Sequence, residues 1–200
     1  KEIFRIRPGL WALEEYRSIL ADRGIVAQDA TNSDSVQAQE FNHSYYQGLL
    51  LYIGNMKKLA TYVPAQDKNR ECINVKLGEI STLDRVPPFS YQEFVNRSST
   101  IDVMWFQPNS LGSDVMMPNS FFEVEHSTDI QNSLCKFSDL QSFNAQMFIV
   151  ADARRQDEFR ARLSHDYFKP ISDRVKFVSY DKLDRYYEGL MTQQKSSLIL

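Results

Sequence analysis

The sequence predicts an α/β fold in which a mixed central sheet is flanked by helices. Two sets of segments and their order carry this prediction. Strands are indicated by runs rich in aromatic and β-branched residues, at 60–63, 101–106, 121–125, 147–151 and 175–178. Helices are indicated by apolar periodicity, at 41–54, 130–142, 154–163 and 180–190. From residue 41 onward this gives an α-β-β-β-α-β core, the alternation expected of an α/β sandwich.

The remaining segments are assigned from turn residues and composition. Residues 1–7 alternate as the last strand of a hairpin that stops at Pro8-Gly9, and 11–20 has helical periodicity. Residues 24–39 are polar and indicate a linker or a mobile loop. The stretch 73–83 fits a strand or a helix, and 91–96 fits a short helix. The segment between the strands at 101–106 and 121–125 is rich in Pro, Asn, Ser and Gly and is interpreted as a loop.

Size and charge limit the function classes. The 200 residues suffice for one substantial core, and a net charge of −3 argues against a module that wraps DNA by global basicity. A nuclease stays possible, since metal-binding carboxylates offset a local basic groove. Cys72 and Cys135 lack CxxC spacing and are interpreted as reduced thiols of a cytoplasmic protein. No apolar run reaches membrane-spanning length. The chain begins with Lys1 rather than Met, so we expect a segment upstream of it.

Three carboxylates form the candidate site. Side chains alternate across a strand, so Glu123 and Glu125 point to the same side. Asp102 lies on the preceding strand, and pairing of the two strands would bring it to Glu123. Like charges in an apolar setting are costly unless a positive group lies between them, and a divalent cation prefers carboxylate oxygens. The pattern therefore predicts a site for one or two Mg²⁺ ions that polarise a scissile phosphate.

Polar groups around the predicted helix at 130–142 would complete this site. Lys136 is the candidate for a positive side chain beside the carboxylates. Ser127 or Thr128 can cap the helix, with Asp129 favourable near its N-terminus. Outer polar groups around the metal ligands are expected from Thr128, Gln131 and Gln141.

The arrangement Asp102…Glu123-x-Glu125 on this order of elements resembles the PD-(D/E)XK superfamily of restriction endonuclease-like nucleases. The family pattern ends in lysine, whereas this chain has Glu125, a variant found among some restriction enzymes. The run from Phe122 to Leu140 looks like a bacterial subgroup whose members carry a basic residue at the place of Lys136. The segments His43-x-x-Tyr46-Gln47 and 63–67 also look like that subgroup, and the resemblance covers roughly 40–180.

The resemblance implies Mg²⁺-dependent hydrolysis of double-stranded DNA by a type II-like restriction enzyme. Asp102 and Glu123 would bind metal, Glu125 would replace the lysine that positions the water, and Lys136 would supply the missing charge. A homodimer is expected, because cutting both strands usually needs two active sites. Residues 40–200 would be the nuclease domain. Residues 1–30 look like the C-terminal remnant of a winged-helix-like module with a linker helix.

Simpler interpretations stand beside these. Asp102 could accept backbone hydrogen bonds at a strand end, the Glu pair could lie on an exposed edge, and Lys136 could be solvated. His126 is expected to be structural, and His43 and His165 to be isolated, without a zinc site.

A rival function is a DNA-binding or sensing module on a nuclease-like scaffold that has lost catalysis, favoured by the missing lysine. Candidate DNA contacts are Lys68, Arg70, Arg154 and Arg155. Acidic neighbours make a salt-bridged surface equally plausible for the last two.

Overall fold

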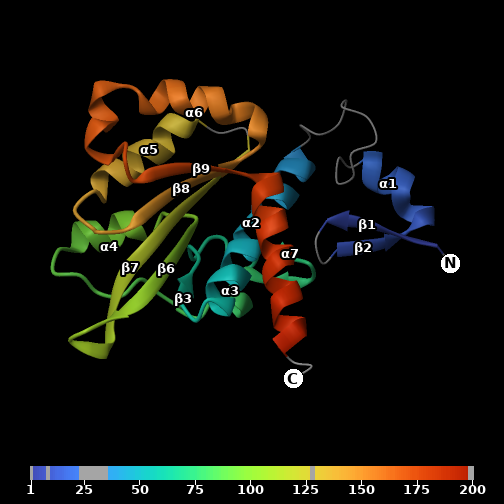
Figure 1. The fold of residues 1–200 in the computed structure, drawn as a ribbon, viewed down its shortest axis with the longest axis horizontal. Helices are drawn as coiled ribbons and strands as arrows, with labels where there is room; N and C mark the ends of the chain where they lie inside the picture. The colour runs from blue at the N-terminus through green and yellow to red at the C-terminus, as the bar shows by residue number, and fades with distance from the viewer. Residues whose placement is uncertain (1, 8–9, 23–35, 127–128, 198–200) are drawn as a thin grey trace.

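The computed structural model describes residues 2–7, 10–22, 36–126 and 129–197. Its centre is a five-stranded sheet in the order β3-β6-β7-β8-β9 (Figure 1). Strands β3 (Ala60–Tyr62), β6 (Val103–Asn109) and β7 (Gly112–Glu125) are antiparallel neighbours. Strand β8 (Gln146–Ala151) runs parallel to both β7 and β9 (Val175–Ser179). The predicted α/β fold with a mixed central sheet is confirmed.

The two faces of the sheet carry separate hydrophobic cores. On one face, α2 (Val36–Met56) and α7 (Tyr180–Ser197) contact each other and pack over the strands. On the other face lie α4 (Gln92–Ser98), α5 (Ile130–Asp139), α6 (Gln156–Leu163) and the 3-10 helix η3 (Asp166–Ile171). Strand alternation assigns the side chains to these cores, so that Phe122 and Val124 join the first and Phe121 joins the second.

The segment interpreted as a loop between the strands is instead the greater part of a long hairpin. Strand β7 begins at Gly112, and its pairing with β6 runs from Asn109↔Gly112 to Val103↔Phe122. Two prolines, which depress strand propensity, lie inside this hairpin because its register shifts next to them. The shifts fall between Trp105 and Phe106, opposite Pro118, and between Pro108 and Asn109. The long pairing fixes the position of β7 against β6.

The helix boundaries differ from those predicted at several ends. Helix α2 begins at Val36, so positions 36–39 of the expected linker are helical, and 24–35 lie outside the described residues. Helix α5 ends at Asp139 rather than at 142, and the next residue, Leu140, leaves the helical region (φ −102°, ψ 13°). Helix α7 continues well past 190. A short 3-10 turn, η2 (Ala153–Arg155), precedes α6 where one continuous helix was predicted.

The ambiguous stretch at 73–83 resolves into short elements. Strands β4 (Glu71–Cys72) and β5 (Val75–Lys76) form a hairpin with a two-residue turn, and α3 (Leu77–Ile80) follows. The turn residues Ile73 and Asn74 both take positive φ, as a tight hairpin with the natural strand twist requires. Hydrophobic periodicity could not identify this segment, because none of its elements is long enough to repeat the pattern.

The N-terminal segment forms a hairpin of its own. Strands β1 (Ile3–Arg7) and β2 (Leu10–Leu13) pair with each other and not with the central sheet. The helix predicted for 11–20 therefore starts later, as η1 (Glu14–Tyr16) and α1 (Arg17–Asp22), because the backbone of β2 is committed to β1. The assignment of 1–30 to a winged-helix remnant stays a prediction.

Candidate functional site

Two buried carboxylates project from the end of β7 toward α5. The exposed fractions of Glu123 and Glu125 are 1% and 4%. The hydroxyl of Ser133, on α5, lies 3.0 Å from Glu123 Oε2 and also hydrogen-bonds Glu125 Oε1. A hydroxyl has one proton to donate, so it holds the two side chains together while satisfying one carboxylate at a time. Sequence reasoning missed Ser133, although it precedes Lys136 by three positions and so shares a face of the helix with it.

Lys136 supplies a positive charge to this pair. Its Nζ donates to Glu123 Oε2 at 2.7 Å and to the carbonyl of Thr100 at 3.1 Å. The lysine side chain is 17% exposed, and its carboxylate partner is buried. In such a shielded position the Coulomb attraction between the two charges is stronger than on an open surface. The structure thus brings Lys136 to the carboxylates.

Asp102 reaches the same site from the residue before β6, not from within the strand as predicted. Its Oδ2 accepts a hydrogen bond of 2.8 Å from the backbone N–H of Val124, between the two glutamates. Its Oδ1 lies 3.8 Å from His43 Nε2. The side chain of Asp102 is 13% exposed, so it stands at the mouth of the site, while the glutamates lie deeper.

The first helix of the core and the turn after β3 complete the cluster. Candidate ligand atoms of His43, Asp67 and Asp102 all lie within 4.8 Å of one another. From α2, Gln47 Nε2 donates to Asp67 Oδ2 at 3.0 Å and to the Asp102 carbonyl at 3.2 Å. The expectation that His43 is isolated is therefore wrong. His43 and Gln47 are four positions apart on α2, which places them on one face of the helix.

Burial and mutual repulsion of the carboxylates dominate the electrostatics of the site. Burial raises the pKa of Glu123 well above its ordinary value, and the negative charge of Asp102 raises it further, against the opposing effect of Lys136. Burial also raises the pKa values of Asp102 and Glu125. Burial alone would lower the pKa of Lys136, but the surrounding carboxylates, Glu123 first, raise it overall. The carboxylates therefore ionise reluctantly unless more positive charge is added.

Two buried oxygen atoms in this region have no hydrogen-bond partner. They are Glu123 Oε1 and Gln47 Oε1. A buried polar atom without a partner is costly, so such an atom in a native protein needs an explanation, for example a catalytic role or a bound water or ion. Carboxylate oxygens of Asp67 and Asp102 and the imidazole of His43, whose candidate ligand atoms lie within 4.8 Å of one another, are a donor set that a divalent metal can use.

Residues 25–198 match the family described as Type II restriction enzyme NmeDI C-terminal domain. The chain belongs to this family. Neither a curated protein nor a solved structure matches the chain. The match includes every element of the central sheet and all three carboxylates of the site. Type II restriction enzymes are thus the relatives of this chain, as the resemblance implied at the level of the enzyme class.

The four side chains predicted to contact DNA all form ion pairs or hydrogen bonds within the protein. Lys68 Nζ donates to the Asp84 carbonyl at 2.8 Å, and Arg70 Nε lies 3.1 Å from Asp67 Oδ1. Arg70 therefore borders the cluster rather than standing clear of it. Contact of either side chain with DNA stays a prediction.

The two arginines at the start of α6 differ from each other. Arg154 pairs with Asp152 and its side chain is 78% exposed. Arg155 pairs with Glu158, donates to the His126 carbonyl at 3.2 Å and is 16% exposed. Its charge also acts on Glu125, whose pKa it lowers against the effect of burial. Arg155 is thus a second cation near the carboxylates, whereas Arg154 lies on the open surface.

The outer polar groups predicted around the metal ligands lie elsewhere or cannot be placed. Gln131 is exposed and accepts a hydrogen bond from Arg162, and Gln141 is exposed beyond the end of α5. Thr128 and Ser127 lie outside the described residues, and Asp129 caps α5 by accepting from Gln131 N.

None of the helices in the described part of the chain has the length and hydropathy needed to cross a bilayer.

Proposed function

We propose that this chain is the nuclease domain of a type II-like restriction endonuclease of the PD-(D/E)XK superfamily, which hydrolyses phosphodiester bonds of double-stranded DNA with Mg²⁺. The observation that carries the proposal is the convergence of Asp102, Glu123 and Lys136 from three separate elements. Membership of a restriction-enzyme family supports it. Assembly as a homodimer belongs to the same proposal, since two sites are needed to cut both strands.

The residues present fit a hard divalent cation. Glu123 Oε1 is buried without a hydrogen-bond partner, and its neighbour Asp102 has one carboxylate oxygen left after Oδ2 accepts from Val124. Oxygen ligands of this kind are the ones that Mg²⁺ prefers. Asp102 and Glu123 would therefore hold the ion. When bound, Mg²⁺ polarises the scissile phosphate and lowers the pKa of a water molecule.

The protein side chains have separate tasks in this proposal. Lys136 fixes Glu123 by its 2.7 Å contact and places a positive charge where charge develops on the phosphate. Glu125 takes the place of the usual lysine, and burial raises its pKa. A carboxylate with a raised pKa is a better proton acceptor near neutral pH, so Glu125 would take the proton of the attacking water. Ser133 holds Glu125 in position for that step.

The rival function is a DNA-binding or sensing module without catalysis. It is favoured by one observation, the glutamate at position 125 where the superfamily pattern has lysine. The position of Lys136 weighs against it, because its ammonium group reaches the same carboxylate pair from α5.

Incubation with supercoiled plasmid and Mg²⁺ separates the two functions. We expect the parent protein to nick or linearise the plasmid and Glu123→Ala to lose this activity. The control is Glu93→Ala, an exposed glutamate on α4 away from the cluster, which should cleave like the parent. Binding without cleavage by the parent would establish the rival, and undiminished cleavage by Glu123→Ala would refute the site.

A further inference from the structure

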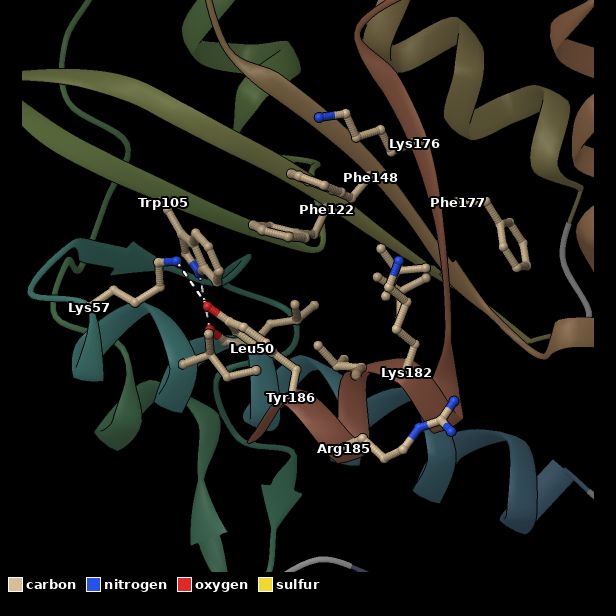
Figure 2. Close-up of a pocket in the computed structure, with 14 residues that line it drawn as sticks. Leu50, Lys57, Trp105, Phe122, Phe148, Lys176, Phe177, Lys182, Arg185 and Tyr186 are labelled. Carbon is tan, nitrogen blue, oxygen red and sulfur yellow. Dashed lines mark hydrogen bonds between the residues drawn. The ribbon is translucent and has the colours of Figure 1, made fainter. Parts of the chain in front are cut away.

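A pocket opens on the face of the sheet opposite the carboxylates. It lies between α2, α7 and the strands and has a volume of about 530 Å³ (Figure 2). Ligand-binding pockets for small molecules are typically about 300–1,000 Å³. The floor comes from alternate strand positions, so Phe122 lines this pocket while its neighbour Glu123 faces the other core. The pocket is therefore separate from the carboxylate site.

The floor of the pocket is aromatic and held in place. The rings of Phe122 and Phe148 stack with centroids 4.9 Å apart and planes 11° apart. Trp105 packs against Phe122 at 4.4 Å, and its indole N–H donates to the Leu50 carbonyl at 3.0 Å. Such a fixed set of rings offers an aromatic ligand a rigid apolar contact surface at little cost in side-chain entropy.

The rim of the pocket is basic. Cations from the turn after α2, from β9 and from α7 surround it, namely Lys57, Lys176, Lys182 and Arg185. None of the described residues that line it is acidic, although the whole chain carries a net charge of −3. Lys176, Lys182 and Arg185 are exposed, so their charges are available at the mouth. Lys57 is held over the ring of Tyr186 and donates to its hydroxyl at 3.1 Å. A basic rim above an apolar floor selects a ligand with an anionic end and an apolar body.

We propose that this pocket binds a nucleotide, with its base packed against the aromatic floor of Trp105, Phe122 and Phe148 and its phosphate held by the rim cations. A base supplies the flat ring that suits the floor, and a phosphate supplies the charge that suits the rim. The same chemistry can come from a free nucleotide or from a nucleotide unstacked from DNA. The inference does not rest on the proposed nuclease function, because no residue of the carboxylate site lines the pocket.

Calorimetric titration of the whole protein with dAMP tests the proposal. The titration is done in EDTA, so that metal at the carboxylates does not contribute. We expect binding of one dAMP per chain, and binding of deoxyadenosine and of inorganic phosphate weaker by about tenfold or more, since each supplies half of the interactions. No binding of dAMP, or tighter binding of decanoate, which has an anionic end but no ring, would overturn the proposal.

Matched variants locate the binding. Lys182→Glu should weaken dAMP binding by about tenfold, whereas Lys169→Glu, the same charge change on exposed η3 away from the pocket, should leave it unchanged. Phe148→Leu keeps the floor apolar but removes a ring, and we expect about tenfold weaker binding of dAMP. Equal affinities for the two lysine variants would overturn the assignment. The assignment would also be overturned if Lys182→Glu dissociated a dimer without weakening dAMP binding. That result would show that a second copy of the chain covers the pocket.

Competition identifies the source of the nucleotide. Duplex DNA with one bulged adenine and the fully paired duplex are each added to the dAMP complex. Displacement by the bulged duplex alone indicates a nucleotide unstacked from DNA. Retention of dAMP against both duplexes indicates a free nucleotide. Equal displacement by both duplexes would show binding of the DNA backbone at the rim and would contradict the proposal.

Discussion

The two faces of strand β7 differ in chemistry although their residues alternate along one chain segment. Glu123 and Glu125 face α5, where Ser133 and Lys136 meet them. Phe122 faces α2 and α7 and lines a pocket with a basic rim. One face therefore presents carboxylates and the other a rim of cations. The sheet keeps the two apart, because a strand sends successive side chains to opposite sides.

This separation depends on strand register. A slip of one residue would bury Phe122 against Lys136 and place Glu123 among the rings of the other core, so each face would lose the side chains that define it. The backbone N–H of Val124, which donates to Asp102, opposes such a slip by tying the register to the site. The acidic face is thus stabilised by its cations, and the aromatic face by its packing.

Removal of the cation from the acidic face is expected to have the largest effect. Lys136→Ala leaves Glu123 without its 2.7 Å partner and removes the charge next to the phosphate, so plasmid cleavage should fall by about 10²–10³-fold. Initial rates with Mg²⁺ measure this, and circular dichroism checks the fold. Lys169→Ala, at an exposed lysine on η3, is the control. Full cleavage by Lys136→Ala would remove Lys136 from the mechanism.

A substitution that disturbs packing on the aromatic face should lower the free energy of unfolding of the protein. A Cβ at Gly54 of α2 would lie 2.6 Å from Trp105 Nε1, so Gly54→Ala forces the helix away from the sheet. We expect its free energy of unfolding in urea to fall by about 2 kcal/mol. At Gly189 of α7 a Cβ would meet nothing within 4 Å, so Gly189→Ala should raise stability by about 0.5–1 kcal/mol. Equal effects of the two variants would contradict the close packing of α2.

The imidazole on the acidic face should influence the choice of metal. His43 adds a nitrogen donor beside Asp67 and Asp102, and imidazole suits transition metals better than Mg²⁺. His43→Ala should therefore weaken Mn²⁺ binding by about tenfold and Mg²⁺ binding less. The control is His165→Ala, an exposed histidine before η3. Calorimetric titration with each metal measures the dissociation constants for Mn²⁺ and Mg²⁺. Equal losses of affinity for the two metals in His43→Ala would exclude His43 as a selective ligand.

The smallest expected effect is a pH-dependent gain of stability on the acidic face. Burial raises the folded-state pKa of Glu125 above 4.5, so the folded protein binds the proton more tightly than the unfolded chain. Stability therefore falls as pH rises from about 4.5 through the raised pKa, and the loss persists above it. The side chain of Glu125→Gln cannot ionise. The free energy of unfolding of this variant should therefore be about 1 kcal/mol higher than that of the parent at pH 8, but not at pH 4. Urea unfolding at both pH values measures it, and a difference independent of pH would contradict the shift.

The sequence predicts the parts of this arrangement that rest on local pattern. Alternation placed Glu123 and Glu125 on one side, and helical spacing placed Lys136 within reach of them. Hydrophobic runs located three of the five strands, β3, β8 and β9, to within one residue of their ends. These features depend on neighbouring residues, whose periodicity the sequence displays directly.

Features that depend on distant residues were missed. Asp67 and His43 join the site through a turn and a helix that only the folded chain brings to Asp102. Ser133 carried no signal of its own, because serine on a helix is common. The prolines at 108 and 118 concealed the long hairpin, which exists because the register shifts beside them. The pocket is formed by packing of α2 and α7 on the sheet, and no motif marks it.

Cation binding at the acidic face tests the central claim most directly. The measurement is calorimetric titration of Mn²⁺ and Mg²⁺ into the parent, Glu123→Gln and Glu93→Gln, the last being exposed on α4. Glu123→Gln keeps the shape of the side chain and removes the charge of the carboxylate whose Oε1 has no hydrogen-bond partner. The predicted result is loss of metal binding in Glu123→Gln and parent-like binding in Glu93→Gln. Parent-like binding in Glu123→Gln would contradict a metal site on this face of β7.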